Sequence, residues 1–182
     1  MRNIFVLCTG RCGSVSLARA LNHAENYTCG HETRAHFVGQ KRFDYPANHI
    51  EVDNRLSWHL GRLDQAFGQE AFYVHLKRDV NETAESFAKR FDKGIMAAYH
   101  SAILMQGRKK NPDLIPLDFC LDYCNTVNDN IRLFLHDKPC QLTVHMENMN
   151  SQLPELWHAI EAEGDVGMAL REFDNKHNAS NS

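Results

Sequence analysis

The chain has 182 residues, of which 43% are hydrophobic and 24% charged, and its formal net charge is −3. This composition excludes a disordered chain, and the length suits one domain over residues 1–182 with a substantial core. The charge balance argues against nucleic acid or an anionic membrane as a partner, and no apolar run approaches the roughly 20 residues of a membrane span.

The N-terminal stretch is expected to form a strand, a turn and a helix in succession. Residues 4–8 are an almost wholly apolar run, typical of a strand buried on both faces. The turn that follows contains Gly10 and Gly13, and the helix begins at about residue 14. Backbone amides converge at such a helix N-terminus, where the helix dipole also favours negative charge. One guanidinium and two hydroxyls add to this field, from Arg11, Ser14 and Ser16. The stretch therefore predicts a site for phosphate or sulfate.

This loop differs from the phosphate loop of ATP- and GTP-splitting enzymes. That loop reads G-x-x-x-x-G-K-[ST], and its lysine reaches the terminal phosphates. Counted from Gly10 or from Gly13, the pattern fails, because the loop contains no lysine. A nucleotide or nucleoside kinase is therefore an alternative that lacks its main support. A glycine-rich turn that binds no ligand is the other alternative.

Two further short strands are expected before residue 54. Residues 27–30 form a weak strand that leads into His31-Glu32-Thr33-Arg34, and residues 49–52 form a strand that ends at Asp53. A helix is expected over 56–67. Asp53 has two interpretations: the N-cap region of that helix, which we favour, or a proton acceptor at the strand end.

The next strand is expected over 71–76 and runs towards Arg78, and a helix over 80–91 follows it. The apolar side of this helix is its buried side, and Ser86 lies on another face, where it is available to a ligand. Arg78 also has a simpler interpretation, because exposed arginines often pair with nearby carboxylates such as Glu82 for about 0–1 kcal/mol.

The rest of the chain alternates in the same way. The pattern predicts a strand over 140–145 and helices over 94–106, 117–136 and 153–162. Surface loops are expected over 35–47 and 107–116. The second loop carries Arg108, Lys109 and Lys110. These residues form either a solvent-exposed face or a basic surface that attracts an anionic partner.

This alternation of strands and helices predicts an α/β fold, with a mostly parallel central sheet covered on both faces, in three layers. Ligands of such sheets bind beyond the carboxyl ends of the strands. The residues singled out so far follow the expected strand ends: Arg11, Ser14, Glu32, Asp53 and Arg78.

Cysteine usage indicates free thiols in a reducing cytoplasm, since the six cysteines do not form the pattern of a small disulfide scaffold. The apolar run near the N-terminus has five residues, too few for a signal peptide, so a cytoplasmic protein is expected. Cys120 and Cys124 share a helix face and are expected to pack there. The eleven histidines show no metal-binding spacing, so no metal site is predicted.

The segment Thr9-Gly10-Arg11-Cys12-Gly13-Ser14-Val15-Ser16-Leu17 resembles the 5′-phosphosulfate loop of sulfotransferases that use 3′-phosphoadenosine 5′-phosphosulfate (PAPS). In that family the loop follows the first strand. An arginine that ends a later strand, with a serine eight residues further on, grips the 3′-phosphate. Arg78 and Ser86 have this spacing. Two elements in the right order make a far more specific match than either alone.

The resemblance implies the P-loop-like sulfotransferase architecture and transfer of a sulfuryl group from PAPS to a hydroxyl or amine, without a metal. The implied donor-binding residues are Gly10, Arg11, Cys12, Gly13, Ser14, Val15, Ser16, Arg78 and Ser86. The implied catalytic residues are Glu32 as the base, His31 as the second candidate, Asp53 as an alternative base, and Arg11. A non-catalytic nucleotide-binding protein stays open as an alternative.

Two weaker parallels concern the C-terminal half. Glu147 matches the glutamate of a Tyr-Glu-Asp-Leu-like sequence that closes a late strand in the family. A C-terminal basic loop often completes the nucleotide site in relatives, and the residues of this chain that would supply it are Arg171, Lys176, His177 and Asn178. The acceptor is expected to be a small molecule or a carbohydrate, bound near residues 33–47 and 92–116.

Overall fold

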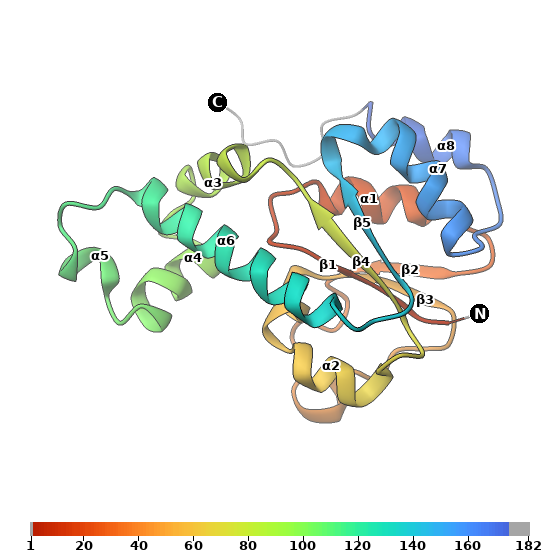
Figure 1. The fold of residues 1–182 in the computed structure, drawn as a ribbon, viewed down its shortest axis with the longest axis horizontal. Helices are drawn as coiled ribbons and strands as arrows, with labels where there is room; N and C mark the ends of the chain where they lie inside the picture. Colours follow the sequence, from red (N-terminus) through yellow and green to blue (C-terminus); the bar gives the residue numbers. More distant parts are fainter. Residues whose placement is uncertain (1, 175–182) are drawn as a thin grey trace.

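A parallel sheet lies at the centre of the computed structural model, which describes residues 2–174 (Figure 1). Within these residues the sheet has five strands in the order β2-β3-β1-β4-β5, and every neighbouring pair is parallel. The strands are β1 (Ile4–Leu7), β2 (Thr28–His31), β3 (His49–Val52), β4 (Phe72–Lys77) and β5 (Gln141–His145). The expected α/β fold with a mostly parallel sheet is confirmed.

The central strand β1 is apolar throughout because both of its faces are covered. Ile4 and Val6 belong to one core cluster, while Phe5 and Leu7 belong to another, and none of the four is exposed. The helices of the first cluster are α1 (Ser14–Leu21), α7 (Met149–Ala159) and α8 (Val166–Arg171). Those of the second include α2 (Leu60–Phe67), α3 (Val80–Ala88) and α6 (Pro116–Leu135), together with Met96 of α4 (Gly94–Ala98). The side-chain alternation of a strand thus gives the three layers that were expected (Figure 1).

Several helix boundaries differ from the expected ones because of tertiary contacts. The helix expected over 56–67 is divided into a 3₁₀-helix, η2 (Asn54–Trp58), and α2, with His59 in a non-helical conformation between them. Asp53 caps η2, so the helical segment begins earlier than the apolar pattern indicates. The helix expected over 80–91 ends at Ala88, and that expected over 153–162 runs from Met149 to Ala159.

The segment after α3 contains more turns than expected. The helix predicted over 94–106 consists of α4 (Gly94–Ala98) followed by a π-helical turn, η3 (Tyr99–Ile103). The loop predicted over 107–116 contains α5 (Gly107–Lys110). Figure 1 shows that α4 and α5 project beyond the layered body of the fold.

Other short elements were not expected from the sequence. These are η1 (Gly39–Arg42) inside the loop predicted over 35–47, η4 (Met146–Asn148) after β5, and α8. The guanidinium of Arg171, at the end of α8, contacts the sulfur of Met168 at 3.4 Å. Lys176, His177 and Asn178, the other residues of the expected C-terminal basic segment, lie outside the described residues.

None of the helices within residues 2–174 combines the length and the apolar composition that crossing a bilayer requires.

Candidate functional site

The site predicted from the sequence lies where the chain changes direction within the sheet. The neighbouring strands β1 and β4 both end at the same edge. After β1 the chain moves to β2 on one side, and after β4 it moves to β5 on the other side. Such a point leaves a crevice beyond the carboxyl ends of the two strands, where ligands of parallel sheets bind.

The loop between β1 and α1 has a tightly constrained backbone. Gly10, Arg11 and Gly13 all have positive φ, at 84°, 57° and 84°. A Cβ atom at Gly10 would lie 2.9 Å from Nδ2 of Asn54, and one at Gly13 would overlap the sulfur of Met146. Both positions therefore require glycine, for conformation and for space, as expected of a loop whose backbone approaches a ligand.

Three side chains from other elements hold this loop in place, and sequence analysis did not identify them. Tyr123 of α6 donates a hydrogen bond to the carbonyl of Thr9 at 2.8 Å, and Asn54 donates to the same carbonyl at 3.4 Å. Ser57 donates to the carbonyl of Cys8 at 3.2 Å. No local sequence signal marks these residues, because each bond joins segments that are distant in the chain.

Helix α1 begins at Ser14, and Gly13 is its N-cap. Because glycine has no side chain, the first amides of this helix donate no hydrogen bond to a side chain of their own cap residue, and amides at such a helix N-terminus can bind an anion. The hydroxyl of Ser14 lies 3.1 Å from Nε2 of His31 at the end of β2. The structure thus brings the predicted anion loop and the predicted base region together.

The second predicted anion grip adjoins the first. Nη1 of Arg78 donates to the carbonyl of Arg11 at 3.2 Å, and Nε of Arg11 donates to the hydroxyl of Ser86 at 3.0 Å. Nη2 of Arg78 also pairs with Glu82 at 2.6 Å, on the exposed side of α3. Arg78, Ser86 and the loop are therefore neighbours, as the resemblance to the sulfotransferases implied.

The side chain of Arg11 extends towards Ser86, so it lies on the Arg78 side of the loop. Partial burial lowers the pKa of Arg11, and the positive charges of Arg90 and Arg78 lower it further. Arg90 was not singled out in the sequence. Its charge adds to a positive field around Ser86.

Of the remaining predicted loop residues, Cys12 and Ser16 have buried side chains, whereas Val15 is partly exposed. Cys12 and Ser16 are 0% and 4% exposed, so they offer a ligand their backbone alone. The thiols of Cys8 and Cys12 contact each other, which raises the pKa of Cys8 and lowers that of Cys12. All six cysteines are free thiols, as expected. Within residues 2–174, no three His, Cys, Asp or Glu side chains are placed to hold a metal ion.

Asp79 and Glu147 brace the end of β4. The carboxylate of Asp79 accepts from the amide of Glu82 at 2.9 Å and caps α3. The amide of Asp79 donates to Oε1 of Glu147 at 2.7 Å. The late glutamate singled out in the sequence thus joins the strand end that carries Arg78.

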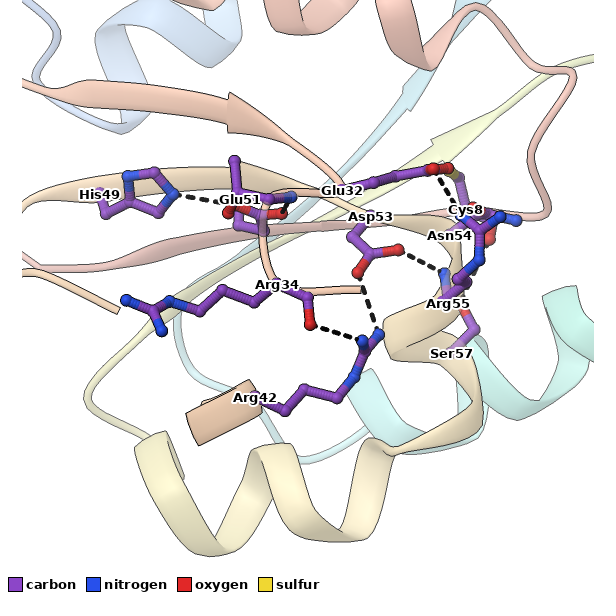
Figure 2. Close-up of polar contacts among 11 residues, drawn as sticks. Cys8, Glu32, Arg34, Arg42, His49, Glu51, Asp53, Asn54, Arg55 and Ser57 are labelled. Atoms are coloured by element: carbon purple, nitrogen blue, oxygen red, sulfur yellow. Dashed lines mark hydrogen bonds and ion pairs between the residues drawn. The ribbon is translucent and has the colours of Figure 1, made fainter. Parts of the chain in front are cut away.

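Asp53 is buried at the end of β3 (Figure 2). Its carboxylate accepts from the amide of Arg55 at 2.8 Å and from Nη2 of Arg42 at 3.0 Å. The favoured interpretation of Asp53 as a helix cap is therefore confirmed. Burial raises the pKa of Asp53, while the Arg55 amide and the Arg42 charge oppose this rise.

Glu32 lies in the turn after β2 and has a positive φ of 54°. Its carboxylate forms an ion pair with Arg55, and the two side chains are 31% and 43% exposed. The amide of Glu32 donates to the carbonyl of Val52 at 3.1 Å, so the turn continues the sheet towards β3. Glu32 is thus accessible to solvent at the same edge as the anion loop, whereas Asp53 is not.

Comparisons with known proteins add to this geometry. No protein-family model matches the sequence. No curated protein matches it either.

Solved structures do match the fold. The sulfotransferase domain from the curacin biosynthetic pathway has a TM-score of 0.62 and 14% identity, over 95% of this chain and 78% of that one. A sulfotransferase from Alicyclobacillus acidocaldarius has a TM-score of 0.60 and 11% identity, over 92% and 85%. The mouse sulfotransferase SULT7A1 complexed with PAP has a TM-score of 0.64 and 14% identity, over 99% and 68%. As the resemblance of the loop and of the Arg78–Ser86 pair predicted, the chain has the fold of the sulfotransferases.

Proposed function

We propose that this protein is a sulfotransferase that moves a sulfuryl group from PAPS to a hydroxyl or amine acceptor. The observation that carries the proposal is the junction of two predicted anion grips at one crevice, through the contacts of Arg11 with Ser86 and of Arg78 with Arg11. PAPS is charged at both ends, so it needs two such grips. The fold of the chain supports the same reaction class.

The residues present fit the 5′ end of this donor. Gly13 has a positive φ of 84° and is the N-cap of α1, so the turn into the helix is made by a residue without a side chain. The amides at the start of α1 and the hydroxyl of Ser14 would hold the phosphosulfate, which supplies the sulfuryl group when the donor is bound. A donor aimed at the negative charge that develops during transfer contributes on the order of 3 kcal/mol. The amides and guanidiniums supply this positive field, so the scheme requires no metal ion.

The 3′-phosphate would be held by Arg78 and Ser86, with the guanidinium of Arg11 beside them. Arg78 pairs with Glu82 in this structure, and the Glu82 side chain is 57% exposed. An exposed pair of this kind is worth about 0–1 kcal/mol. A phosphate dianion, which offers more charge and bidentate acceptors, replaces the carboxylate readily.

Glu32 would take the proton from the acceptor. Its carboxylate is accessible, and the adjacent His31 contacts Ser14 at the loop, which supports a base at this turn. The pair with Arg55 must open or reorient before Glu32 accepts the proton. His31 is the second candidate. Asp53 is less suitable, because its carboxylate is buried and paired with Arg42.

The acceptor is proposed to be a small molecule or a carbohydrate, and the protein to act in the cytoplasm. The walls of the acceptor site would come from residues 33–47 and from the projecting segment 92–116. The free state of all six cysteines agrees with a reducing compartment.

Isothermal titration tests the donor site. We expect adenosine 3′,5′-bisphosphate to bind and ATP with magnesium to bind at least tenfold more weakly, an energy difference of about 1.4 kcal/mol. The reverse preference would support the kinase alternative and overturn the proposal.

A transfer assay with labelled sulfate on PAPS and a panel of alcohols, phenols, sugars and amines tests the reaction. Labelled product is the expected result. Binding of the bisphosphate without transfer to any acceptor, and without acceptor-independent hydrolysis of PAPS, would favour the non-catalytic alternative.

A further inference from the structure

A buried carboxylate lies beside the turn that carries Glu32. Glu51 of β3 is fully buried, and its oxygens accept three hydrogen bonds. Thr33 supplies two of them, from its amide at 2.7 Å and from its hydroxyl at 2.6 Å. His49 supplies the third at 2.9 Å (Figure 2). A buried carboxylate is stable only with partners of this kind, so breaking its contacts is costly.

The sheet leaves room for this arrangement. Gly30 of β2 lies opposite Glu51 in the register of β2 and β3. A Cβ at Gly30 would overlap the methyl group of Thr33. The missing side chain therefore allows Thr33 to fold back onto Glu51. Behind this contact, the hydroxyl of Thr28 lies 2.8 Å from Nδ1 of His49.

The turn that these contacts hold is a strained one. Glu32 directly precedes Thr33 and has a positive φ of 54°. A non-glycine residue in this region is strained, and it persists where its surroundings determine its conformation. The amide bond from Glu32 to Val52 and the two bonds from Thr33 to Glu51 are such surroundings.

We propose that Glu51 is a positioning residue, which through Thr33 holds the His31–Glu32 turn against the Ser14 end of the anion loop. Glu51 itself touches neither of the proposed substrates. The consequence for catalysis rests on the proposed function, since it assumes that Glu32 or His31 takes the acceptor proton. The held conformation of the turn does not depend on that assumption.

Three substitutions separate positioning from general stability. Thr33→Val removes the hydroxyl bond to Glu51 and keeps the shape of the side chain, whereas Thr33→Ser restores the hydroxyl. Thr28→Val is the matched control, because it removes a hydrogen bond from the far end of the same network. For Thr33→Val we expect kcat to fall about tenfold, the equivalent of one hydrogen bond to a charged group. We expect the affinity for adenosine 3′,5′-bisphosphate to be unchanged.

Thr33→Ser and Thr28→Val are expected to keep kcat near that of the unsubstituted protein. Equal kcat in all three variants would overturn the catalytic role. Amide hydrogen exchange gives a readout that needs no acceptor: exchange at Glu32 and Thr33 should quicken in Thr33→Val and stay unchanged in Thr28→Val. Unchanged exchange in both variants would overturn the positioning itself. If the unsubstituted protein transfers no sulfate, the proposed function fails, and the exchange result still decides whether Glu51 holds the turn.

Discussion

The two halves of the candidate site hold their charged side chains in different ways. At the ends of β1 and β4, the guanidiniums of Arg11 and Arg78 contact a hydroxyl and a carbonyl, and Arg78 also pairs with the exposed Glu82. At the ends of β2 and β3, the carboxylates of Glu32 and Asp53 each pair with an arginine.

In the β2–β3 half the ion pairs fix the backbone, whereas under the proposed function the guanidiniums of the β1–β4 half hold the charged donor. The proposed donor site and the turn that carries the proposed base thus lie side by side on one sheet. The predictions below test this division, from the largest expected effect to the smallest.

Glu32→Gln tests whether the β2–β3 half carries the proton acceptor of the reaction. We expect kcat to fall by a factor of about 100 to 10,000, the range for loss of a general base, because glutamine accepts no proton at neutral pH. Affinity for adenosine 3′,5′-bisphosphate should be unchanged in titration calorimetry. His31→Asn is the companion variant. A larger loss of kcat in His31→Asn than in Glu32→Gln would move the role of base to the histidine.

Arg78→Ala tests whether the β1–β4 half holds the 3′-phosphate of the donor. We expect affinity for adenosine 3′,5′-bisphosphate to fall about a hundredfold, because two charge-assisted hydrogen bonds to the 3′-phosphate are lost. Titration calorimetry measures the change. Arg132→Ala is the control, since Arg132 is an exposed arginine on α6 that pairs with Asp129. Affinities for the two variants that agree within a factor of three would show that Arg78 is no part of the donor site.

His75, a buried residue of β4, tests whether protonation of an imidazole in the protein interior lowers stability. Burial lowers the pKa of His75 from 6.5 to about 4, although a hydrogen bond with Asn128 opposes the change. Because the unfolded chain binds the proton at higher pH than the folded protein, stability should fall as pH drops from 6.5 towards 4. The part due to His75 should be about 2 kcal/mol between pH 7.5 and pH 5.

Urea unfolding at a series of pH values measures this effect. His75→Gln should flatten the profile across that window, and His158→Gln, at an exposed position of α7, should leave it unchanged. A profile that His75→Gln does not alter would show that this imidazole is protonated equally in both states.

Glu82→Gln removes the exposed carboxylate that pairs with Arg78. The carboxylate occupies the guanidinium of Arg78, so it competes with the 3′-phosphate. Its removal should raise affinity for adenosine 3′,5′-bisphosphate by about threefold, within the 0–1 kcal/mol of an exposed pair. Weaker binding would indicate that Glu82 orients Arg78 for the ligand, contrary to competition.

Much of the framework could be predicted from the sequence because it rests on local patterns. The apolar run at β1 and the helical spacing that follows predicted the strand, the loop and α1. The resemblance of Arg78 and Ser86 to the family's 3′-phosphate grip implied two side chains that the structure places at the same loop. Such features depend on the chain within about ten residues, where periodicity and spacing carry information.

Long-range contacts set the features that could not be predicted. Tyr123 falls within the longest predicted helix, but its hydroxyl donates a hydrogen bond to the carbonyl of Thr9 in the loop. The side chain of Arg11 extends towards Ser86, which lies 75 positions away in the sequence. The break at His59 and the π-helical turn after α4 follow from packing, which overrides local helix propensity.

The bond between Tyr123 and Thr9 also bears on the order of folding. It joins residues 114 positions apart, and contacts of such separation form late because the intervening chain must first be ordered. The loop between β1 and α1 is therefore completed only after α6 has docked. The proposed donor site would accordingly take its final shape only once a much later segment of the chain has joined the sheet.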